Sequence, residues 1–422
     1  MRTETATVTS KFSTHSAVPL ANHRATARRL AIDVPTITSD MTNADVLHIL
    51  GEHRDLVSLP VLEDDQPIGL ISRNIFMSQM SKPYYRELYE KKSCIAFMDK
   101  SPLIVDIDTP IETLAAKAVA SGDKTLADGF MFIEGNRFAG IGVGLDLMHA
   151  LVELQIEKNR QVMQSIDYAS TIQRAMLGES LNAMQATQQD VAIVWEPRDV
   201  VGGDFYHFEM FANGWFAALA DCTGHGVPGA FLTLIASSSL RHALNQHGPQ
   251  NPAFLMSEVS KGMKQALGQH APGSAETASN DGMDAIFMWF DASLNTLTSA
   301  HAKMPLFVLA ADQDDVVAVD GERRGLGYPD TPADANWTNH TTLLRPGTLL
   351  FACTDGLIDQ IGGPKNIAFG KRRLRQALQK HRSQDLTALF DILMKELRSY
   401  QGAQLRRDDL TLFGFRFPSN QP

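Results

Sequence analysis

Aspartates with similar neighbours recur four times in the second half of this chain. They lie in the strings VGGDFYH (Asp204), ADCTGHGVPGA (Asp221), TDGLIDQ (Asp355) and RRDDLTLFGF (Asp408 and Asp409). Each carboxylate stands beside glycine or at the end of an apolar run typical of a β-strand, so a sheet would hold it while it points outward. Converging carboxylates are the hard oxygen ligands that Mg²⁺ and Mn²⁺ prefer, and paired ions activate water against a phosphoryl group. The strings therefore predict a two-metal site for phosphoester hydrolysis.

The composition limits the class of protein. A chain of 422 residues with 44% hydrophobic and 20% charged residues is long enough for two or three globular domains. A net charge of −10 and a pI near 5.7 argue against a nucleic-acid partner, because no large basic surface is available to neutralise phosphates.

Cysteine use and hydropathy indicate where the protein works. Its three cysteines, Cys94, Cys222 and Cys353, are far apart and odd in number, which favours a reducing compartment without disulfides. No window approaches eighteen uninterrupted apolar residues, so no membrane span is expected. The Ser-, Thr- and Ala-rich residues 1–33 are expected to form a disordered leader. The protein is expected to be cytoplasmic.

An internal repeat follows the leader. The segment that begins PTITSDMTNADVLHIL is echoed by the one that begins PLIVDIDTPIETLAAK, with Gly69 and Gly140 in matching places, as are Met77 and Met148. Each copy has the pattern of a β stretch, a helix, two strands and a helix start. Repeated units of this kind bury one face against each other. Residues 34–150 resemble a tandem CBS pair, an α/β regulatory module.

The CBS resemblance implies an adenosine nucleotide as ligand, but the matching positions are incomplete. The family has a hydroxyl residue three positions after the strand glycine and an aspartate six after it. The first copy has Ser72 but Ile75 in these places, and the second has Val143 and Asp146. Two interpretations stay open: a ligand sensor, and a purely structural, dimerising module.

Residues 146–177 form a stretch without Gly or Pro that predicts one long linker helix. Leu147, Leu151 and Leu154 make an apolar stripe, which continues with a shift of phase through Val162 and Ile166. This spacing suits a dimerising coiled coil, while the alternative is an amphipathic helix that lies on its own domain. We expect a homodimer, because the helix joins an input-like module to the predicted catalytic region.

Short strands and a few helices alternate from residue 178 to 418, which predicts a layered α+β domain. The expected strands are 191–196, 215–222, 284–291, 296–302, 306–310, 348–355 and 411–417, and the expected helices are 228–244, 252–267 and 386–400.

The four aspartate strings resemble the signatures of the SpoIIE/RsbU branch of PPM (protein phosphatase 2C-like) Ser/Thr phosphatases. The resemblance covers residues 165–417, includes YASTIQRAML, and extends in GGPKNIAFGKRRL and GMDA to the SiaA-like subgroup. It implies a PPM-type β-sandwich flanked by helices, two Mn²⁺ or Mg²⁺ ions, and hydrolysis without a covalent enzyme intermediate. The implied substrate is a phosphoserine or phosphothreonine on a small partner-switch protein, either an anti-anti-sigma factor of the STAS type or a SiaC-like protein.

The resemblance also implies which residues form the site. Asp204 and Asp221 would bind the ions, with Asp221 bridging them, and the backbone carbonyl of Cys222 would face one ion. Asp355 matches the metal-binding aspartate of the family's Asp-Gly turn. In the last string Asp408 would be the ligand and Asp409 its neighbour, although the order of these two stays open.

Three further features have open roles. His225 either donates a proton to the leaving group or only hydrogen-bonds to the ligands. Asp284 touches an ion or the substrate, or merely caps a strand. The stretch 268–282, rich in Gly, Ser and Pro, is expected to form a mobile flap near the site.

Other classes of function fit less well. The string GGDFY suggests a diguanylate cyclase, but Phe205 stands where that motif needs its paired acid. A cysteine phosphatase needs Cys, five residues and then Arg, and Cys94, Cys222 and Cys353 are followed at that spacing by Lys100, Pro228 and Asp359. A catalytically silent phosphoprotein-binding regulator with a PPM fold remains as the alternative.

Overall fold

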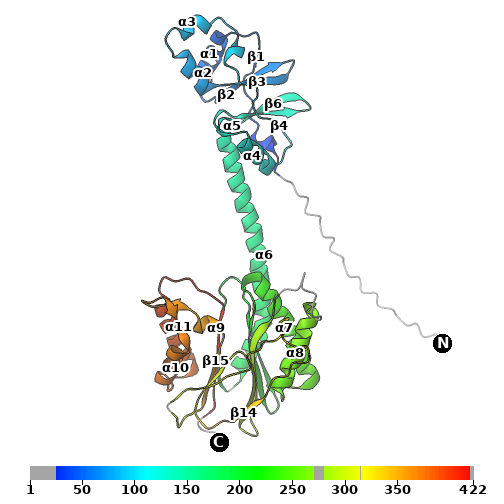
Figure 1. Ribbon diagram of the computed structural model, residues 1–422, viewed down its shortest axis with the longest axis vertical. Coiled ribbons are helices and arrows are strands. Elements are labelled where there is room, and N and C mark those ends of the chain that lie inside the picture. The colour runs from blue at the N-terminus through cyan, green and yellow to red at the C-terminus, as the bar shows by residue number, and fades with distance from the viewer. Residues whose placement is uncertain (1–24, 188, 270–279, 314, 419–422) are drawn as a thin grey trace, which may run out of the picture. The chain divides into compact units, whose positions relative to one another are not determined.

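The computed structural model describes residues 25–187, 189–269, 280–313 and 315–418 (Figure 1). The chain divides into two compact units, residues 1–161 and 162–422. Helix α6 (Gly144–Ala186) contributes residues to both units. None of the described helices combines the length and apolar composition needed to cross a bilayer.

The first unit contains the predicted repeat. One half comprises β1 (Ile37–Thr38), α1 (Asn43–Glu52), β2 (Ser58–Glu63), β3 (Gln66–Ser72) and α2 (Arg73–Met80), and the other β4 (Ile104–Asp106), α4 (Ile111–Ala120), α5 (Asp123–Asp128), β5 (Phe130–Glu134), β6 (Arg137–Gly142) and the start of α6. Each half has a three-stranded sheet with one parallel and one antiparallel pairing. The register shifts at Val61/Leu62 in one half and at Phe132/Ile133 in the other, so the two copies share even this irregularity.

Local sequence signals explain the helices of this unit. Thr42 and Asp45 form a reciprocal capping box at the start of α1, and the Ser72 side chain accepts from the backbone N–H of Ile75 at the start of α2. Val46 and Leu50 then stand on one face of α1 and are buried in the core of the first half. Between the halves lie α3 (Tyr85–Tyr89) and a short 3₁₀ turn, Cys94–Phe97.

The folded region begins earlier than the predicted leader would allow. Ala27 and Leu30 form a 3₁₀ turn and are buried in the core of the second half, and Ile32 bridges to Ile141. Residues 25–33 therefore belong to the first unit, because their apolar side chains complete its core. The rest of the predicted leader, residues 1–24, lies outside the described residues.

The second unit is built on two antiparallel sheets of five strands. The first sheet has the order β14 (His340–Leu343), β11 (Thr296–Ala302), β10 (Met283–Asp291), β9 (Gly214–Cys222), β8 (Asp204–Phe211); the second has the order β13 (Val317–Val319), β12 (Leu306–Leu309), β15 (Leu349–Cys353), β18 (Leu410–Arg416), β7 (Asp190–Glu196). Phe415 of the second sheet packs against Trp215 and Phe290 of the first, with ring centroids 4.8 Å and 5.3 Å apart. The main core of the unit therefore lies between the sheets.

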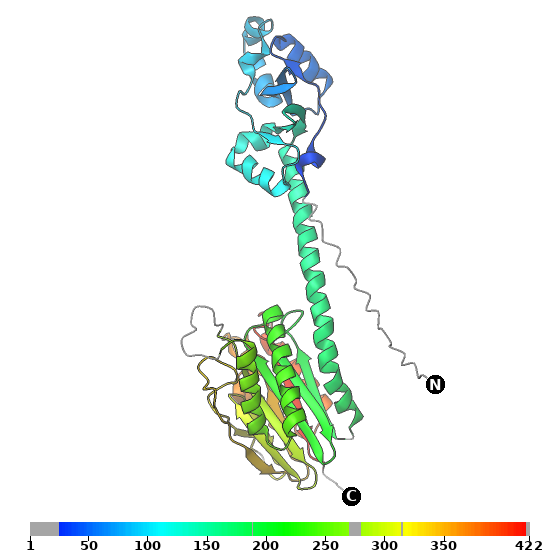
Figure 2. The same cartoon turned by 90° about the vertical axis from the view of Figure 1, so that its right-hand side faces the viewer.

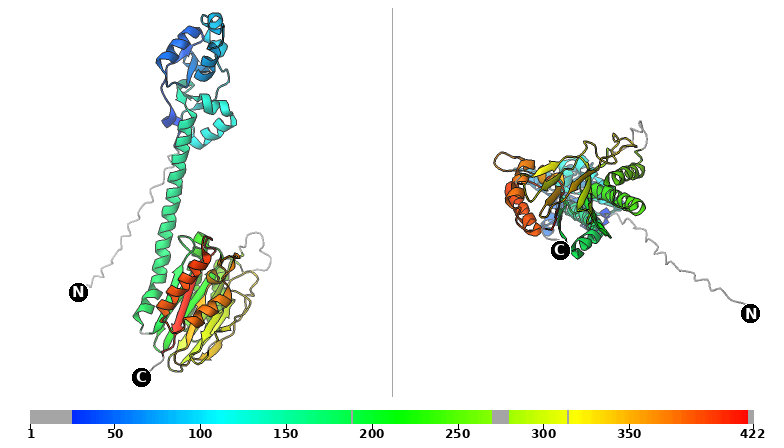
Figure 3. Two further views of the ribbon diagram at one scale, coloured as in Figure 1. Left: turned by 90° about the vertical axis from the view of Figure 1, so that its left-hand side faces the viewer. Right: turned by 90° about the horizontal axis from the view of Figure 1, so that it is seen from below.

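Helices cover the outer faces of both sheets. α7 (Gly226–His247) and α8 (Pro252–Ala266) pack side by side on the first sheet (Figure 2), and α10 (Gly370–Lys380) and α11 (Leu386–Gln401) lie beyond the second (Figure 3, right). β9 is buried along nearly its whole length because it faces helices on one side and the other sheet on the other. The predicted α+β sandwich flanked by helices is thus confirmed. The short elements α9 (Asp355–Ile358), β16 (Ile361–Gly362) and β17 (Ile367–Ala368) follow β15.

Candidate active site

Three carboxylates stand abreast at one end of the first sheet. Asp204 begins β8 and pairs in register with Asp221 near the end of β9, and Asp221 pairs with Asp284 near the start of β10. Neighbouring strands lie about 4.8 Å apart, so the register alone brings residues distant in sequence into one acidic row.

Asp204 is held by the opposite sheet. Its carboxylate, in a residue that is only 1% exposed, accepts hydrogen bonds at one oxygen from the hydroxyls of Thr354 and Thr411, both at 2.7 Å. The other oxygen, Oδ1, is buried and has no hydrogen-bond partner among the described residues. A buried carboxylate oxygen without a donor is costly, so the position calls for a cation.

Glycines allow the loops that carry the aspartates to pack backbone against backbone. A Cβ on Gly203 would come within 2.8 Å of the carbonyl oxygen of Cys222 and would collide with that of Gly224. Cys222 instead donates its backbone N–H to the carbonyl of Gly203 at 3.0 Å. The glycines of VGGD and TGHG are therefore required by close approach of the two loops.

The linker helix holds the first of these loops through a residue that the sequence analysis did not single out. Gln173 of α6 is 2% exposed; its amide donates to the carbonyl of Gly202 at 2.7 Å and accepts from the N–H of Gly202 at 3.2 Å. The same amide nitrogen lies 3.2 Å from the hydroxyl of Thr233 on α7. A single glutamine in a helical pattern carries no signal that would identify such a role.

The second sheet contributes two further carboxylates, those of Asp355 and Asp408, and the acidic row hereafter includes them. Asp355 follows β15 at the start of α9, and Asp408 precedes β18. Gly356 packs directly against the backbone of Asp409, where any Cβ would collide with its carbonyl oxygen. The Asp221 side chain hydrogen-bonds to the carboxyl of Asp355, so the two sheets meet at this point.

The carboxylates raise one another's pKa. Burial, followed by the charges of Asp204 and Asp355, holds the pKa of Asp221 well above its ordinary value, with smaller contributions from Asp408 and Asp284. Burial is also the main reason why the pKa of Asp204 is well above its ordinary value. Withdrawal from water and then repulsion from Asp408 raise the pKa of Asp355 to about 6. The site is thus an acidic cluster that a positive charge would stabilise.

Asp408 and Asp409 have different surroundings. Asp409 is 2% exposed, and its two carboxylate oxygens accept from the backbone N–H groups of Arg198, at 2.6 Å, and Gly203, at 2.5 Å. Its carboxylate therefore fixes the VGGD loop, and the prediction that Asp409 is itself a metal ligand is not favoured. Within the described residues, the side chain of Asp408 accepts one hydrogen bond, from the backbone N–H of Asp409 at 2.9 Å. The charge of Asp408 also contributes to raising the pKa of Asp221.

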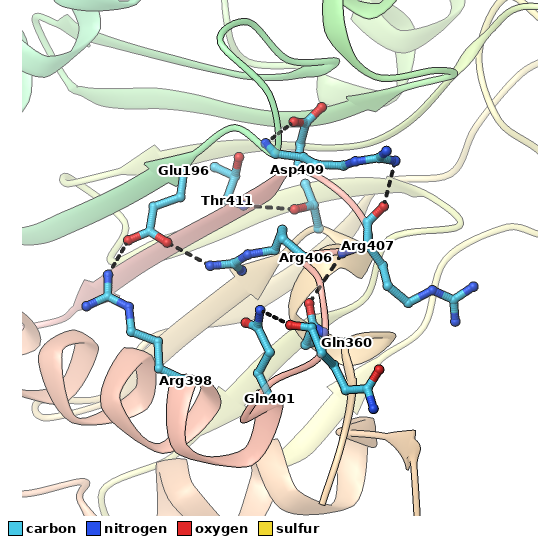
Figure 4. A network of polar contacts seen from close by, with 11 residues as sticks. Glu196, Gln360, Arg398, Gln401, Arg406, Arg407, Asp409 and Thr411 are labelled. Carbon is cyan, nitrogen blue, oxygen red and sulfur yellow. Dashed lines mark hydrogen bonds and ion pairs between the residues drawn. The ribbon is translucent and has the colours of Figure 1, made fainter.

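A polar network positions the segment that carries these two aspartates (Figure 4). Glu196 at the end of β7 pairs with Arg398 at 2.6 Å and with Arg406 at 2.8 Å. Gln360 accepts from the N–H of Arg407 and donates to the carbonyl of Leu405. The chain therefore enters β18 along a fixed path.

His225 is the N-terminal cap residue of α7 and follows Asp221 by four residues in the chain. Its Nδ1 lies 2.9 Å from Oδ2 of Asp199, and both side chains are about half exposed. A carboxylate can only accept, so this contact places a proton on Nδ1 and leaves Nε2 to exchange a proton with a substrate.

The thiol of Cys222 takes no part in nucleophilic chemistry. The side chain is buried, and burial followed by repulsion from Asp221 and Asp204 raises the pKa of the thiol well above its ordinary value. Any role of Cys222 at the ions would therefore fall to its backbone carbonyl, which stays a prediction. The central part of the predicted flap, 270–279, lies outside the described residues.

The donor set fits divalent ions of the Mg²⁺ and Mn²⁺ type. The described residues contain no group of three or more His, Cys, Asp or Glu side chains already gathered at metal-holding geometry. The fit depends instead on the hard oxygen donors, on the unpartnered Oδ1 of Asp204, and on the mutual repulsion of Asp204, Asp221 and Asp355.

Comparisons with known proteins agree with this geometry. Residues 212–418 match the family "Stage II sporulation protein E (SpoIIE)", and residues 28–82 match the CBS domain. The chain is similar to the SiaA-PP2C domain of Pseudomonas aeruginosa, with 35% identity over 62% of this chain and 98% of that chain and a TM-score of 0.55. It is also similar to the SpoIIE phosphatase domain and regulatory fragment from Bacillus subtilis, with 18% identity over 55% of this chain and 64% of that one and a TM-score of 0.43.

No curated protein sequence matches the chain. The similarity to the SiaA-PP2C domain spans nearly all of that domain, and the family match covers most of the second unit. The chain therefore belongs to the SpoIIE-type PP2C-like (PPM) Ser/Thr phosphatases, and a CBS domain precedes its phosphatase domain.

Proposed function

We propose that this phosphatase is metal-dependent and hydrolyses a phosphoserine or phosphothreonine on a small signalling protein. The observation that carries the proposal is the acidic row: a buried oxygen of Asp204 has no hydrogen-bond partner within the described part of the chain, and it lies beside the repelling carboxylates of Asp221 and Asp355. A phosphate dianion would be repelled from this cluster unless cations were bound there.

Two Mn²⁺ or Mg²⁺ ions would be held by Asp204, Asp221, Asp355 and Asp408 together with the backbone carbonyl of Cys222, and Asp221 would bridge them. When bound, the ions lower the pKa of water and neutralise charge on the phosphoryl oxygens. Asp409 would act by fixing the VGGD loop rather than as a ligand.

The protein's own groups would orient the reactants and move one proton. Thr354 and Thr411 keep Asp204 in place, since their hydroxyls hold its Oδ2. His225, oriented by Asp199, would donate the proton from Nε2 to the seryl or threonyl oxygen as it leaves. Water would attack the phosphorus directly, in keeping with a buried, protonated thiol at Cys222.

The substrate that we propose is a partner-switch protein, either an anti-anti-sigma factor of the STAS type or a SiaC-like protein. Its dephosphorylation would change which partner it binds. The similarity to the SiaA-PP2C domain supports testing the SiaC-like class first.

The test is hydrolysis by the purified full chain of p-nitrophenyl phosphate and of a phosphoserine peptide, as Mn²⁺ is titrated. We expect turnover that depends on Mn²⁺ and falls by at least a hundredfold in Asp221→Asn. Binding of the phosphopeptide without turnover at any Mn²⁺ concentration would instead support the catalytically silent regulator.

We further propose that the chain forms a homodimer through α6. The stripe predicted from the sequence is not the one available, because Leu147 and Leu151 pack in the core of the first unit. Instead Leu145, Met148, Val152 and Ile156 are exposed and recur every three or four residues, the spacing that a parallel coiled coil buries. The second copy of the chain would cover this stripe, and the CBS unit would alter turnover through the packing of the two helices.

Deleting residues 1–145 tests this regulatory role. We expect the truncated protein to change in turnover or in oligomeric state, measured by light scattering and steady-state kinetics. A truncated enzyme that stayed dimeric with the rate and Mn²⁺ affinity of the full chain would contradict the proposal.

A ligand of the CBS unit is a second candidate function. A cavity of about 380 Å³ in this unit is lined by Tyr85, Tyr89 and Phe97, which suit a base, and by Lys124, a cation that suits a phosphate and that pairs with Asp99 at 2.8 Å. The hydroxyl of Ser72, however, already donates to Asp128 at 2.5 Å. We propose an adenosine nucleotide as the ligand. Thermal shifts with ATP, ADP and AMP, absent in Lys124→Met, would support it, and no shift at millimolar nucleotide would contradict it.

A further inference from the structure

Lys303 continues the acidic row at its outer end. β11 pairs with β10 as far as His301 opposite Ile286, and just beyond the end of β11 Lys303 forms an isolated bridge with Ala285, the neighbour of Asp284. The Nζ atom of Lys303 lies 3.2 Å from Oδ1 of Asp284. The edge of the sheet therefore presents Asp204, Asp221, Asp284 and Lys303 in that order.

The backbone of Lys303 adopts a conformation that a lysine rarely takes. Its φ of 60° lies in the left-handed region, which glycine and asparagine occupy at lower cost. The backbone N–H is held by the carbonyl of Glu322 at 2.8 Å. A long charged side chain kept at a strained position beside a candidate site points to a role in that site.

Tyr328 fixes the ammonium group from a second side. The Nζ atom of Lys303 is 4.3 Å from the centroid of the Tyr328 ring, and the phenol donates to Oδ1 of Asp284 at 3.3 Å. The ring packs against Gly282 and Gly325, where a Cβ on either would collide with it. The lysine is thus oriented by a carboxylate and an aromatic face.

The Lys303 side chain remains 38% exposed despite these contacts. Lys303 directly follows β11, which is two strands away from β9, the strand of Asp221. Two strand spacings are about 10 Å, a distance that a lysine side chain and a phosphoryl group can span together. A cation placed here would attract the phosphate of a substrate toward carboxylates that would otherwise repel it.

We propose that Lys303 binds the non-bridging oxygens of the substrate's phosphate, and that Asp284 and Tyr328 position it for this task. The inference rests on the proposed phosphatase function and assigns to Lys303 the recognition of phosphate monoesters. The competing interpretation is that Lys303 only neutralises Asp284.

The test measures KM, kcat and inhibition by inorganic phosphate for the full chain with Mn²⁺ and a phosphoserine peptide. In Lys303→Met we expect KM and the inhibition constant of phosphate to rise about tenfold or more, because a charge-assisted contact is lost. Lys303→Arg should stay within about threefold of wild type. Lys261→Met, which removes an exposed lysine paired with Glu258 on α8, is the matched control and should change neither constant.

Two further variants separate phosphate binding from neutralisation and from misfolding. Lys303→Gly removes the ammonium group and relieves the strained φ, so it should fold and yet show the same weakened phosphate binding. If Lys303 merely neutralised Asp284, adding Asp284→Asn to Lys303→Met would restore the phosphate constant; we expect no such rescue.

The outcomes distinguish this inference from the proposed function. A wild-type protein without turnover would overturn both. A wild-type protein that turns over substrate, with KM and phosphate inhibition unchanged in Lys303→Met and Lys303→Gly, would overturn the role of Lys303 alone.

Discussion

The adjacent aspartates Asp408 and Asp409 of the string RRDDLT have different surroundings in the structure. The carboxylate of Asp409 receives two backbone N–H groups of the VGGD loop, whereas Asp408 adds its charge to the acidic row. Of these two neighbouring residues, Asp409 thus stabilises a loop and Asp408 adds negative charge to the site. The family resemblance favoured Asp408 as the ligand and left the order open, because the two residues of RRDDLT are equally acidic and only the sheet decides which faces inward.

Substituting each of the two aspartates should have different effects. Asp409→Asn loses an acceptor for buried N–H groups and should lower the free energy of unfolding of the metal-free protein by about 1–3 kcal/mol. Asp408→Asn removes a charge that repels Asp221 and Asp355, so it should keep or raise that stability while it weakens Mn²⁺ binding. Urea unfolding and Mn²⁺ titration measure the two effects. The reverse assignment would be correct if Asp409→Asn lost Mn²⁺ affinity with no loss of stability.

His225→Gln tests the proton donor through the choice of leaving group. A seryl oxygen needs a proton as it leaves, while p-nitrophenolate leaves readily without one, so we expect kcat to fall about a hundredfold on a phosphoserine peptide and far less on p-nitrophenyl phosphate. The control is His242→Gln, which changes an exposed histidine of the same helix. Equal losses on both substrates would assign His225 a purely structural role.

At the scale of elements, apolar patterns predicted most of the second unit. The expected strand 296–302 coincides with β11, and the expected helices 252–267 and 386–400 match α8 and α11 to one residue at their ends. The expected helix 228–244 lies inside α7, which begins two residues earlier and ends three residues later. β8 was not predicted as a strand, because its sequence DFYHFEMF mixes His207 and Glu209 with the aromatic residues. A strand of this kind is identified by its pairing with β9, which is a tertiary contact.

The hydrogen bonds between α6 and the VGGD loop can be tested by substituting Gln173. In Gln173→Leu the clamp on Gly202 is lost while the volume of the side chain is kept, so kcat should fall about tenfold or more and Mn²⁺ affinity should weaken. Kinetics and Mn²⁺ titration of the variant check this, with Gln155→Leu, an exposed glutamine of α6, as control. Unchanged kcat and Mn²⁺ affinity in a folded Gln173→Leu would show that the helix does not position the loop.

At the scale of the whole molecule, the sequence indicated two kinds of domain but not how the sheets are ordered. The four strings could be expected to meet because together they resemble one family, yet the register that aligns Asp204, Asp221 and Asp284 follows from strand order. A lone lysine after a strand is an ordinary residue, so Lys303 could not be predicted. Gln173 belongs to the family-like string YASTIQRAML, but the string does not show that this glutamine holds a loop. Their roles arise only from what the fold places beside them.

The acidic row should also govern how the metal-free protein responds to pH. The pKa of Asp355 is about 6 in the folded protein against 3.8 as its ordinary value, and burial first of all holds the pKa values of Asp204 and Asp221 well above their ordinary value. Between these values the folded state holds protons that the unfolded state has released, so the free energy of unfolding falls as pH rises. The melting temperature of wild type should therefore drop more steeply from pH 5 to 8 than that of Asp221→Asn.

Added Mn²⁺ should remove this penalty, because the ions replace the protons and bind more tightly as pH rises. Melting curves recorded with and without saturating Mn²⁺ at each pH test this. Parallel pH profiles for metal-free wild type and Asp221→Asn would mean that the carboxylates do not repel one another in the folded protein.

The most direct measurement is anomalous diffraction from a crystal of the full chain, or of the second unit, soaked in Mn²⁺. The account predicts two peaks about 3.5–4 Å apart, bridged by Asp221 and bounded by Asp204, Asp355 and Asp408. The absence of peaks at this edge of the sheets under saturating Mn²⁺, or Mn²⁺ bound elsewhere with these carboxylates unliganded, would contradict it.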